Sequence, residues 1–388
     1  MRATVSLAAL VTALKRVAPV CPRSDLPILS TIRLTAAGDR LTLVATDLET
    51  TIRAEVPASG VAAGDLCVSN RLWPLLRTLP RWDLITLHSV DGMRLLVEFP
   101  DGRASLMTLP ADEFPAHATD GQTDITVAFD AHDLKSILSD LLPFVVQKDT
   151  RYYLGGVYLH VLDGRLQCVA TDGHTLARIS RPVPDRDDLP PVIVPKRVVE
   201  TLVRLIGAAR SDQPIHLTYG VTDDGGCKHL TCADPAAGWS LTARPIEGVY
   251  PDYPRVIPQN GHPLLTVPRA RWLATLSRLA AIEDRAHYPG ACLSIMSGTV
   301  SIAASSPDIG EIILALPGTV TGPDGAMLGI NPRLLARVLR PHVGADPVCS
   351  FSAPGDPLVF RGDDILTVLM PMRDVPATTL TLPEGAVA

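Results

Sequence analysis

The sequence predicts an α+β fold of three repeated domains, each with two helices packed on antiparallel sheets, and three observations support this. The 388-residue chain is too long for one ordinary core. Segments 31–50 and 156–175 share an alternating strand, a Gly-containing turn, a second alternating strand and Ala-Thr-Asp, and 291–310 is a weaker third copy. An amphipathic helix precedes each copy, and a strand-helix pair follows each.

The helices are predicted from apolar spacing. Apolar residues follow each other by 3, 1 and 3 positions from Leu7 and again from Leu134, and a looser stripe starts at Leu273. The strand-helix pairs that follow the copies are at 67–80, 192–206 and 327–341. Asn70 and Asn331 stand where an N-cap belongs, and Pro195 or Pro332 marks a first turn.

These repeats predict domains at 1–120, 121–259 and 260–388, the last with a tail at 374–388. The joins near 120 and 260 are expected because Pro, Gly, Asp and Gln cluster there.

Charge is distributed unevenly between the predicted helices and the remainder. The stretches 6–18, 70–81, 130–142, 195–207, 268–280 and 331–342 hold fifteen basic and four acidic residues, a net +11. The remainder carries −17, although the whole chain is only −6. Arginines that merely solvate helix exteriors are one explanation, but such helices normally mix signs. We therefore predict that the helices present a cationic face to a polyanion.

Geometry relates that face to duplex DNA. Helices packed about 10 Å apart leave a hole of about 9 Å when six form a circle, and about 28 Å when twelve do. Only the larger hole admits a duplex, whose major groove alone is about 12 Å wide. A three-domain chain would therefore have to dimerise to encircle DNA, and would hold it by weak, sequence-independent phosphate contacts.

Several other classes of protein are disfavoured. No run of about 18 uncharged apolar residues occurs, so no membrane span is expected. The apolar N-terminus has helical spacing and is followed by Lys15 and Arg16, which favours a folded cytoplasmic protein over a signal peptide. Seven scattered cysteines favour reduced thiols. Cys227, His229 and Cys232 lack a second ligand pair, so neither metal nor cofactor is expected.

Five motifs together resemble the bacterial DNA polymerase III beta subunit, the sliding clamp, from residue 1 to about 373, with the third domain the weakest. They are LPILS (26–30), RYYLGGV (151–157), ATDGHTLA (170–177), YPDYPRVIP (250–258) and MPMR (370–373). The resemblance implies a head-to-tail homodimeric ring around duplex DNA that catalyses nothing. It also implies partners: the replicative DNA polymerase, the clamp loader, repair polymerases and mismatch-repair proteins.

The family's partner-binding pocket, carried over by position, is an apolar cleft with adaptable methionines that suits several peptides. His174 and Arg255 would be polar anchors at its rim. Its lining would be Leu154, Thr171, Gly173, His174, Thr175, Leu176, Pro251, Arg255, Val256, Val368, Met370, Pro371, Met372 and Arg373.

The resemblance likewise implies DNA-facing residues, to which the charge pattern adds Arg71. The tyrosines among them suit stacking on bases or sugars, although neighbours on a strand face opposite sides and one of the pair could be buried. The set is Arg23, Arg71, Lys148, Tyr152, Tyr153, Lys196 and Arg197.

Three departures from the family pattern stand out. Thr175 replaces a longer, often basic residue, so peptide preference could differ. At the dimer edge, expected at Ala104, Leu106, Ile282 and Glu283, Ala104 and Glu283 replace larger apolar residues and imply a weaker dimer. The tail, DVPATTLTLPEGAVA, extends the chain beside the pocket. A specialised clamp paralogue with weakened ring closure therefore remains an alternative.

Two other function classes are open. An enzyme could use Asp172 and His174 near Arg255 as an acid-base pair, but an Asp between a strand and a turn more often caps backbone amides. No nucleophile set accompanies them, and the GxxxxGK[ST], HExxH and dinucleotide motifs are missing. The other class is a protein-only scaffold that never loads on DNA.

Overall fold

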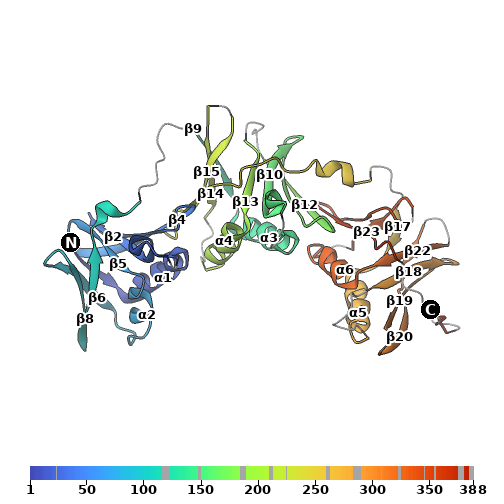
Figure 1. Cartoon of the computed structure of the whole chain (residues 1–388), viewed down its shortest axis with the longest axis horizontal. Helices are drawn as coiled ribbons and strands as arrows, with labels where there is room; N and C mark the ends of the chain where they lie inside the picture. Colours follow the sequence, from blue (N-terminus) through green and yellow to red (C-terminus); the bar gives the residue numbers. More distant parts are fainter. Residues whose placement is uncertain are drawn as a thin grey trace. The chain divides into compact units, whose positions relative to one another are not determined.

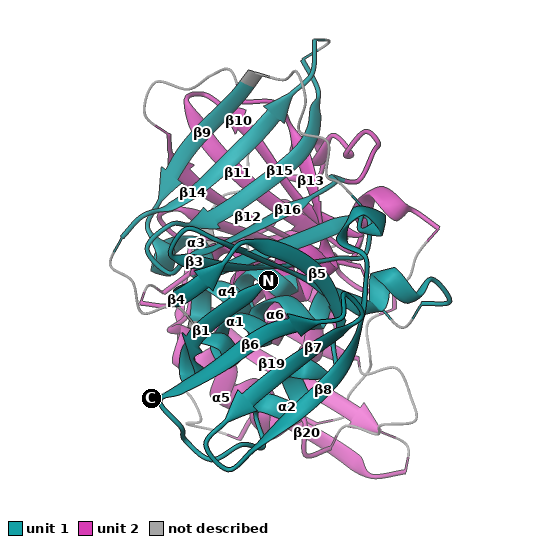
Figure 2. Cartoon of the chain, turned by 90° about the vertical axis from the view of Figure 1, so that its left-hand side faces the viewer, with its two compact units in different colours: residues 1–135, 200–245 teal, residues 136–199, 246–388 magenta. Residues whose placement is uncertain are grey.

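The computed structural model describes residues 1–388 except 23, 116–122, 147–149, 184–188, 209–212, 224, 259–262, 283–289, 307, 322–324, 345, 354, 375–379 and 384–388. The described chain forms two compact units, residues 1–135 with 200–245 and residues 136–199 with 246–388 (Figure 2). The predicted domain joins near 120 and 260 lie outside the described residues.

The threefold repeat is present in the order of the elements (Figure 1). Each repeat runs strand, helix, three-stranded meander, strand, helix, three-stranded meander. The first comprises β1 (Arg2–Ser6), α1 (Leu7–Val17), β2 (Thr31–Ala37), β3 (Arg40–Thr46), β4 (Thr50–Ala62), β5 (Gly64–Ser69), α2 (Leu72–Leu76), β6 (Leu84–Val90), β7 (Arg94–Phe99) and β8 (Gly102–Leu109).

The second repeat comprises β9 (Thr123–Phe129), α3 (Ala131–Leu141), β10 (Gly156–Leu162), β11 (Arg165–Thr171), β12 (Thr175–Pro182), β13 (Val192–Pro195), α4 (Lys196–Ala208), β14 (Ile215–Val221), β15 (Cys227–Asp234) and β16 (Trp239–Ala243). The third comprises β17 (Pro263–Thr266), α5 (Arg269–Leu279), β18 (Ala291–Met296), β19 (Thr299–Ser306), β20 (Gly310–Ala315), β22 (Ala326–Ile330), α6 (Pro332–Leu339), β23 (Val348–Ser350), β24 (Leu358–Arg361) and β25 (Ile365–Leu369), with the short β21 (Thr319–Val320) inserted. The α+β prediction is confirmed.

All six predicted helices are present, but one N-cap was wrong. Asn331 caps α6 as predicted, because its side chain accepts hydrogen bonds from the backbone nitrogens of Arg333 and Leu334. Asn70 does not cap α2: Arg71 stands at the N-cap and makes no capping side-chain bond. The α2 helix is also shorter than predicted and ends at Leu76.

Antiparallel sheets join the repeats within each unit. In the first unit, β4 of the first repeat pairs with β16 of the second, in a sheet of order β1-β6-β7-β8-β5-β2-β3-β4-β16-β15-β14-β9. In the second unit, β12 of the second repeat pairs with β25 of the third, in the order β13-β10-β11-β12-β25-β24-β23-β17-β21. In both units, the third strand of the first meander of one repeat pairs with the third strand of the second meander of the following repeat. The sheet β20-β19-β18-β22 completes the second unit.

Helix α6 and segment 246–258 cover opposite faces of the nine-stranded sheet. Thr367 on β25 faces α6, because its hydroxyl donates a 2.8 Å hydrogen bond to the Val338 carbonyl. Its neighbour Leu366 faces the other way and joins a core cluster with Tyr250 and Tyr253. Segment 246–258 therefore covers the face that α6 leaves open. Among the described residues, no helix is long and apolar enough to cross a membrane.

Candidate functional site

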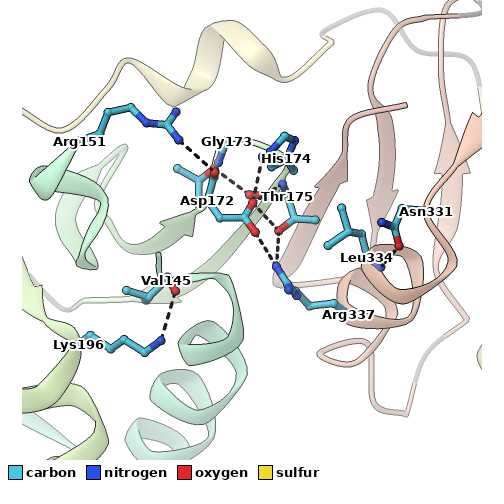
Figure 3. Close-up of polar contacts among 11 residues, drawn as sticks. Val145, Arg151, Asp172, Gly173, His174, Thr175, Lys196, Asn331, Leu334 and Arg337 are labelled. Atoms are coloured by element: carbon cyan, nitrogen blue, oxygen red, sulfur yellow. Dashed lines mark hydrogen bonds and ion pairs between the residues drawn. The ribbon is translucent and has the colours of Figure 1, made fainter. Parts of the chain in front are cut away.

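The turn from Thr171 to Thr175 is the most heavily bonded part of the candidate site (Figure 3). Asp172 Oδ1 accepts hydrogen bonds from the backbone nitrogens of His174 at 2.9 Å and Thr175 at 2.7 Å, and from Thr175 Oγ1 at 3.0 Å. This carboxylate therefore caps backbone amides, as the sequence favoured over an acid-base role. Gly173 allows the turn, because its φ of +85° suits glycine.

Arg337 of α6 binds the other oxygen of the same carboxylate. Its Nη1 lies 2.5 Å from Asp172 Oδ2 and 3.4 Å from Thr175 Oγ1. The two charged side chains are 31% and 19% exposed, so water screens this pair only in part. Arg337 is one of the fifteen basic residues counted in the predicted helices, and here its charge is compensated by a carboxylate of the second repeat.

Arg151 lies on the opposite side of the turn (Figure 3). Its Nη2 donates to the Asp172 carbonyl at 3.5 Å. A Cβ on Gly173 would lie 2.9 Å from Arg151 Nη1, so a larger residue there would move the end of the Arg151 side chain. The two arginines hold the turn from both sides.

The segment Met370–Arg373 is anchored at two points. The Met370 nitrogen donates to the His174 carbonyl at 2.9 Å, and the Met372 nitrogen donates to the Gly329 carbonyl at 2.7 Å. Gly329 must be a glycine, because a Cβ there would overlap the Asp374 carbonyl. The MPMR segment thus lies between the second-repeat turn and strand β22.

The fourteen predicted pocket residues divide into a floor and a rim. Leu154, Thr175, Leu176 and Val368 are buried, and three of them belong to the core beneath segment 246–258. The rim is exposed or half-buried and includes Val256 at 46% and Met370 at 39% exposure. The floor residues are therefore less accessible than the rim, and contact of either group with a partner peptide stays a prediction.

The remaining rim residues occupy the turn and the covering segment. His174 and Gly173 are exposed, as are Pro251 and Arg373, whereas Thr171, Pro371 and Met372 are half-buried. Arg255 is 83% exposed and pairs with the Asp252 carboxylate at 2.5 Å.

Sequence reasoning missed two residues that Figure 3 shows in contact with the turn, Arg151 and Arg337. Arg337 is three positions after Leu334, so the two share one face of α6. That spacing was readable, but which strand the face would meet was not. Arg151 precedes the tyrosines of the RYYLGGV motif, and the motif by itself did not indicate its contact with the turn.

The predicted DNA-facing residues that are described have different environments. Tyr152 is 62% exposed, and Tyr153 packs against the core cluster with its ring 5.7 Å from that of Tyr152. They lie in a short 3-10 helix, Tyr152–Leu154, and not on a strand. Lys196 Nζ donates to the Val145 carbonyl at 3.5 Å.

Arg71 and Arg197 are exposed at the N-terminal ends of α2 and α4. Arg23 and Lys148 lie outside the described residues. Two further helix cations support the fold: Arg16 Nη1 donates to the Ala237 carbonyl at 2.7 Å, and Arg269 donates to the carbonyls of Leu339 and Arg340 at the end of α6.

The predicted dimer-edge residues are partly described. Ala104 and Leu106 are half-buried on β8, opposite Val97 and Leu95 of β7. Ile282 is half-buried in the turn after α5, and Glu283 lies outside the described residues.

On strand β15, Cys227 and His229 are half-buried and Cys232 is buried. Burial raises the pKa of the Cys227 thiol to about 11 and that of Cys232 to about 12. In the part of the chain that is described, no three His, Cys, Asp or Glu side chains are grouped to hold a metal ion.

Comparisons with known proteins agree with this architecture. Residues 1–118 match the model of the DNA polymerase III beta subunit N-terminal domain, and residues 128–252 that of its central domain. The chain is 30% identical to the beta sliding clamp of Caulobacter vibrioides over 96% of this chain and all of that one, and 29% identical to that of Escherichia coli over 88% and 90%.

Solved structures show the same similarity. The Caulobacter crescentus pol III beta structure superposes with a TM-score of 0.86 at 30% identity, covering 96% of this chain and all of that one. A Pseudomonas aeruginosa DnaN sliding clamp bound to griselimycin superposes with a TM-score of 0.85 at 29% identity, covering 96% and 99%.

Proposed function

The chain belongs to the DNA polymerase III beta subunit family, the sliding clamps, and from this membership we propose how its own surfaces close a ring, hold DNA and bind partners. As a sliding clamp it is a processivity factor that serves a DNA polymerase on DNA. We further propose that it does so as a non-catalytic, cytoplasmic homodimer of three-domain chains, with domains at 1–120, 121–259 and 260–388.

The strand pairing between repeats is the observation that carries the ring proposal. Third strands of first and second meanders pair twice within the chain, as β4 with β16 and β12 with β25. The same rule leaves β20 of the third repeat and β8 of the first repeat to pair with each other. In the described sheets, β20 is an end strand, and β8 pairs with β5 only at Thr108 and Leu109. Pairing of β20 with the β8 of a second copy would close a head-to-tail dimer.

The register of that pairing follows from the two internal examples. Thr50 lies opposite Ala243, and Thr175 lies opposite Leu369. In the second repeat, Ile246 lies three residues after Ala243, and its nitrogen bonds the Ile193 carbonyl. In the first repeat, Leu109 lies three residues after Leu106 and pairs with Cys67, which is equivalent to Ile193. Leu106 is thereby equivalent to Ala243, and it would face Gly310 of the partner. Ala104 would then face Ile312.

Dimerisation is tested by light scattering across a dilution series and by cross-linking. A mass of twice 41.4 kDa supports the ring. An Ala104→Cys, Ile312→Cys variant should form covalent dimers with a short bismaleimide, whereas the single Ala104→Cys variant should not. A monomer at all concentrations, with no cross-link, would favour the specialised paralogue with weakened closure.

DNA retention separates the clamp from a protein-only scaffold. The exposed Arg71 and Arg197 are the described cations best placed for phosphate contacts, with Tyr152 exposed for stacking. Charge reversal at both arginines should shorten retention on circular duplex DNA and reduce its salt dependence. Unchanged retention would remove the DNA-encircling proposal.

Partner peptides would bind the rim formed by Val256, Met370, Pro371 and Met372 beside His174. Met370 is exposed and Met372 is half-buried. Methionines adapt to different peptides, and the two backbone anchors of the MPMR segment hold these two in place. The griselimycin-bound relative supports a ligand site in this family. The partners would be the replicative polymerase, the clamp loader, repair polymerases and mismatch-repair proteins.

Peptide binding is measured by fluorescence polarisation with a labelled polymerase-derived peptide. Met372→Ala with His174→Ala should abolish binding while the circular dichroism spectrum stays unchanged. Unchanged affinity would remove this site.

A further inference from the structure

A polar cavity of about 530 Å³ lies in the second unit, on the sheet face opposite α6. Strands β11, β12, β24 and β25 and the turns near 163 and 363 form its walls. Leu366 lines it, while the next residue, Thr367, bonds the Val338 carbonyl of α6 on the other face. The cavity is therefore separated by the sheet from the helix that bears Arg337, and it is distinct from the MPMR rim.

Two of the arginines in this region share one carboxylate as an ion-pair partner. Arg165 Nη2 lies 2.7 Å from Asp364 Oδ1, and Arg181 Nη1 lies 3.6 Å from Asp364 Oδ2. These three side chains are 24% to 47% exposed, so the network lies at the mouth of the cavity.

Two other arginines converge without such compensation. Arg178 on β12 and Arg361 on β24 both stand opposite Leu366 on the strand between them, so they share one face. Arg361 donates to Ser350 Oγ at 2.7 Å and to the Pro258 carbonyl at 3.1 Å, which are neutral acceptors. Among the described residues, neither arginine forms an ion pair with a carboxylate. Burial lowers the pKa of Arg361, and the Arg178 charge lowers it further.

Gln167 supplies a second, independent sign of a ligand. It lines the cavity and is 5% exposed, and its Oε1 has no hydrogen-bond partner among the residues that the structure describes. Its Nε2 donates to Ser180 Oγ at 3.1 Å, which also accepts from Arg165 Nε at 2.7 Å. Ser180 Oγ thus has its own proton left to donate. With the amide ends exchanged, Gln167 accepts that proton and its NH₂ becomes the donor without a partner.

We propose that this cavity is a binding site for a compact phosphate-bearing ligand, held between the guanidinium groups of Arg178 and Arg361 and by the Ser180–Gln167 pair. Guanidinium forks match phosphate oxygens in geometry, and an anion between two like charges relieves their repulsion. A volume of 530 Å³ lies in the range of small-molecule sites and holds more than a single phosphate.

The rim distinguishes such a ligand from a polyanionic chain. Asp163 and Asp363 line the cavity and are exposed in its two bordering turns. Their charges would repel an acidic peptide or a nucleic-acid strand laid across the opening, whereas one phosphate group can pass between them. The proposal does not depend on ring closure or on peptide binding.

Calorimetric titration of the full-length protein with inorganic phosphate, pyrophosphate and ADP, in chloride buffer, tests the proposal. Saturable binding of at least one probe is expected, and the order of affinities distinguishes free phosphate from a nucleotide as the source. No saturable binding of any probe up to millimolar concentration overturns the proposal.

Variants assign the binding to this cavity. Arg178→Gln and Arg361→Gln should each weaken the best probe by about 10- to 100-fold, since each removes a charged hydrogen-bond donor. Asp364→Asn should strengthen it, because the change removes a negative charge from the cavity lining. Arg204→Gln, on α4 of the other unit, is the matched control and should change nothing.

Arg178→Lys keeps the positive charge and removes only the paired N–H donors of the guanidinium group. It therefore tests the site if Arg361→Gln does not fold. An intermediate loss supports the phosphate geometry. Equal affinity of the wild type, Arg178→Gln and Arg178→Lys overturns the assignment.

Discussion

The Asp172 carboxylate has two separable tasks, and two substitutions distinguish them. Oδ1 accepts three hydrogen bonds inside the turn, and Oδ2 pairs with Arg337 of α6. Asp172→Asn keeps an oxygen that can accept the turn bonds but removes the charge. Asp172→Ala removes both. The difference between the two variants therefore isolates the turn bonds, and the asparagine variant isolates the ion pair.

The expected magnitudes follow from the contacts. Each hydrogen bond contributes about 1 kcal/mol net, so the three Oδ1 bonds together contribute about 3 kcal/mol. The ion pair is partly exposed, at 31% and 19%, which places it near the upper end for surface pairs, about 1 kcal/mol. We expect Asp172→Asn to lower the free energy of unfolding by about 1 kcal/mol and Asp172→Ala by about 4 kcal/mol.

Urea denaturation measures the change in unfolding free energy, and a double-mutant cycle with Arg337→Leu measures the pairing. The cycle should show a coupling of about 1 kcal/mol between Asp172→Asn and Arg337→Leu. Hydrogen exchange should show faster exchange of the His174 and Thr175 amides in Asp172→Ala only. Asp252→Asn is the control, since its partner Arg255 is 83% exposed, and it should leave stability unchanged.

Two results would refute this reasoning. Equal destabilisation by Asn and Ala at position 172 would mean that the turn bonds contribute nothing. An additive cycle would mean that Arg337 does not stabilise the turn through this carboxylate.

Three other predictions concern the second unit. Burial lowers the pKa of His342 from 6.5 to about 4, and its Nε2 donates to the Thr367 hydroxyl, whose own proton goes to the Val338 carbonyl. The free energy of unfolding is therefore full above pH 6.5 and falls by up to about 3 kcal/mol towards pH 4. Urea midpoints measured across this pH range should show a slope that His342→Gln abolishes, and an unchanged slope in the variant contradicts this. Gly329→Ala should displace the Asp374 backbone and weaken peptide binding, and unaltered affinity in fluorescence polarisation would count against the anchor. Arg269→Ala should cost about 2 kcal/mol in thermal unfolding, because two α6 carbonyls lose a charged donor, and no loss would exclude this capping role.

Local sequence patterns were sufficient for the repeat and for most elements. Alternation and turn glycines located the meanders at 31–50, 156–175 and 291–310. Apolar spacing located the first helix of each repeat, and the strand-helix segments that follow located the second. These signals are local, because a strand or helix is specified by neighbours a few positions apart. Asn331 was identified for the same reason, since a cap bonds nitrogens two and three residues away.

The candidate site was predictable only in outline. The pocket residues came from motifs of the resembled family. The structure joins two of these motifs, because the Met370 nitrogen bonds the His174 carbonyl, and the pocket as a whole stays a prediction. Whether each side chain points outward was not readable from the motifs, so the prediction grouped buried Leu176 and Val368 with exposed Val256 and Met370.

The sequence by itself therefore determined the three repeats, their helices and strands, and the cationic composition of the helices. Only the tertiary structure decided which repeat's strand meets which, because the pairing of β12 with β25 joins residues nearly two hundred positions apart. That long-range pairing brings α6 to the Asp172 turn. It therefore makes Arg337 a partner of a carboxylate, because a cation's role depends on the charges near it in space and no local pattern records them.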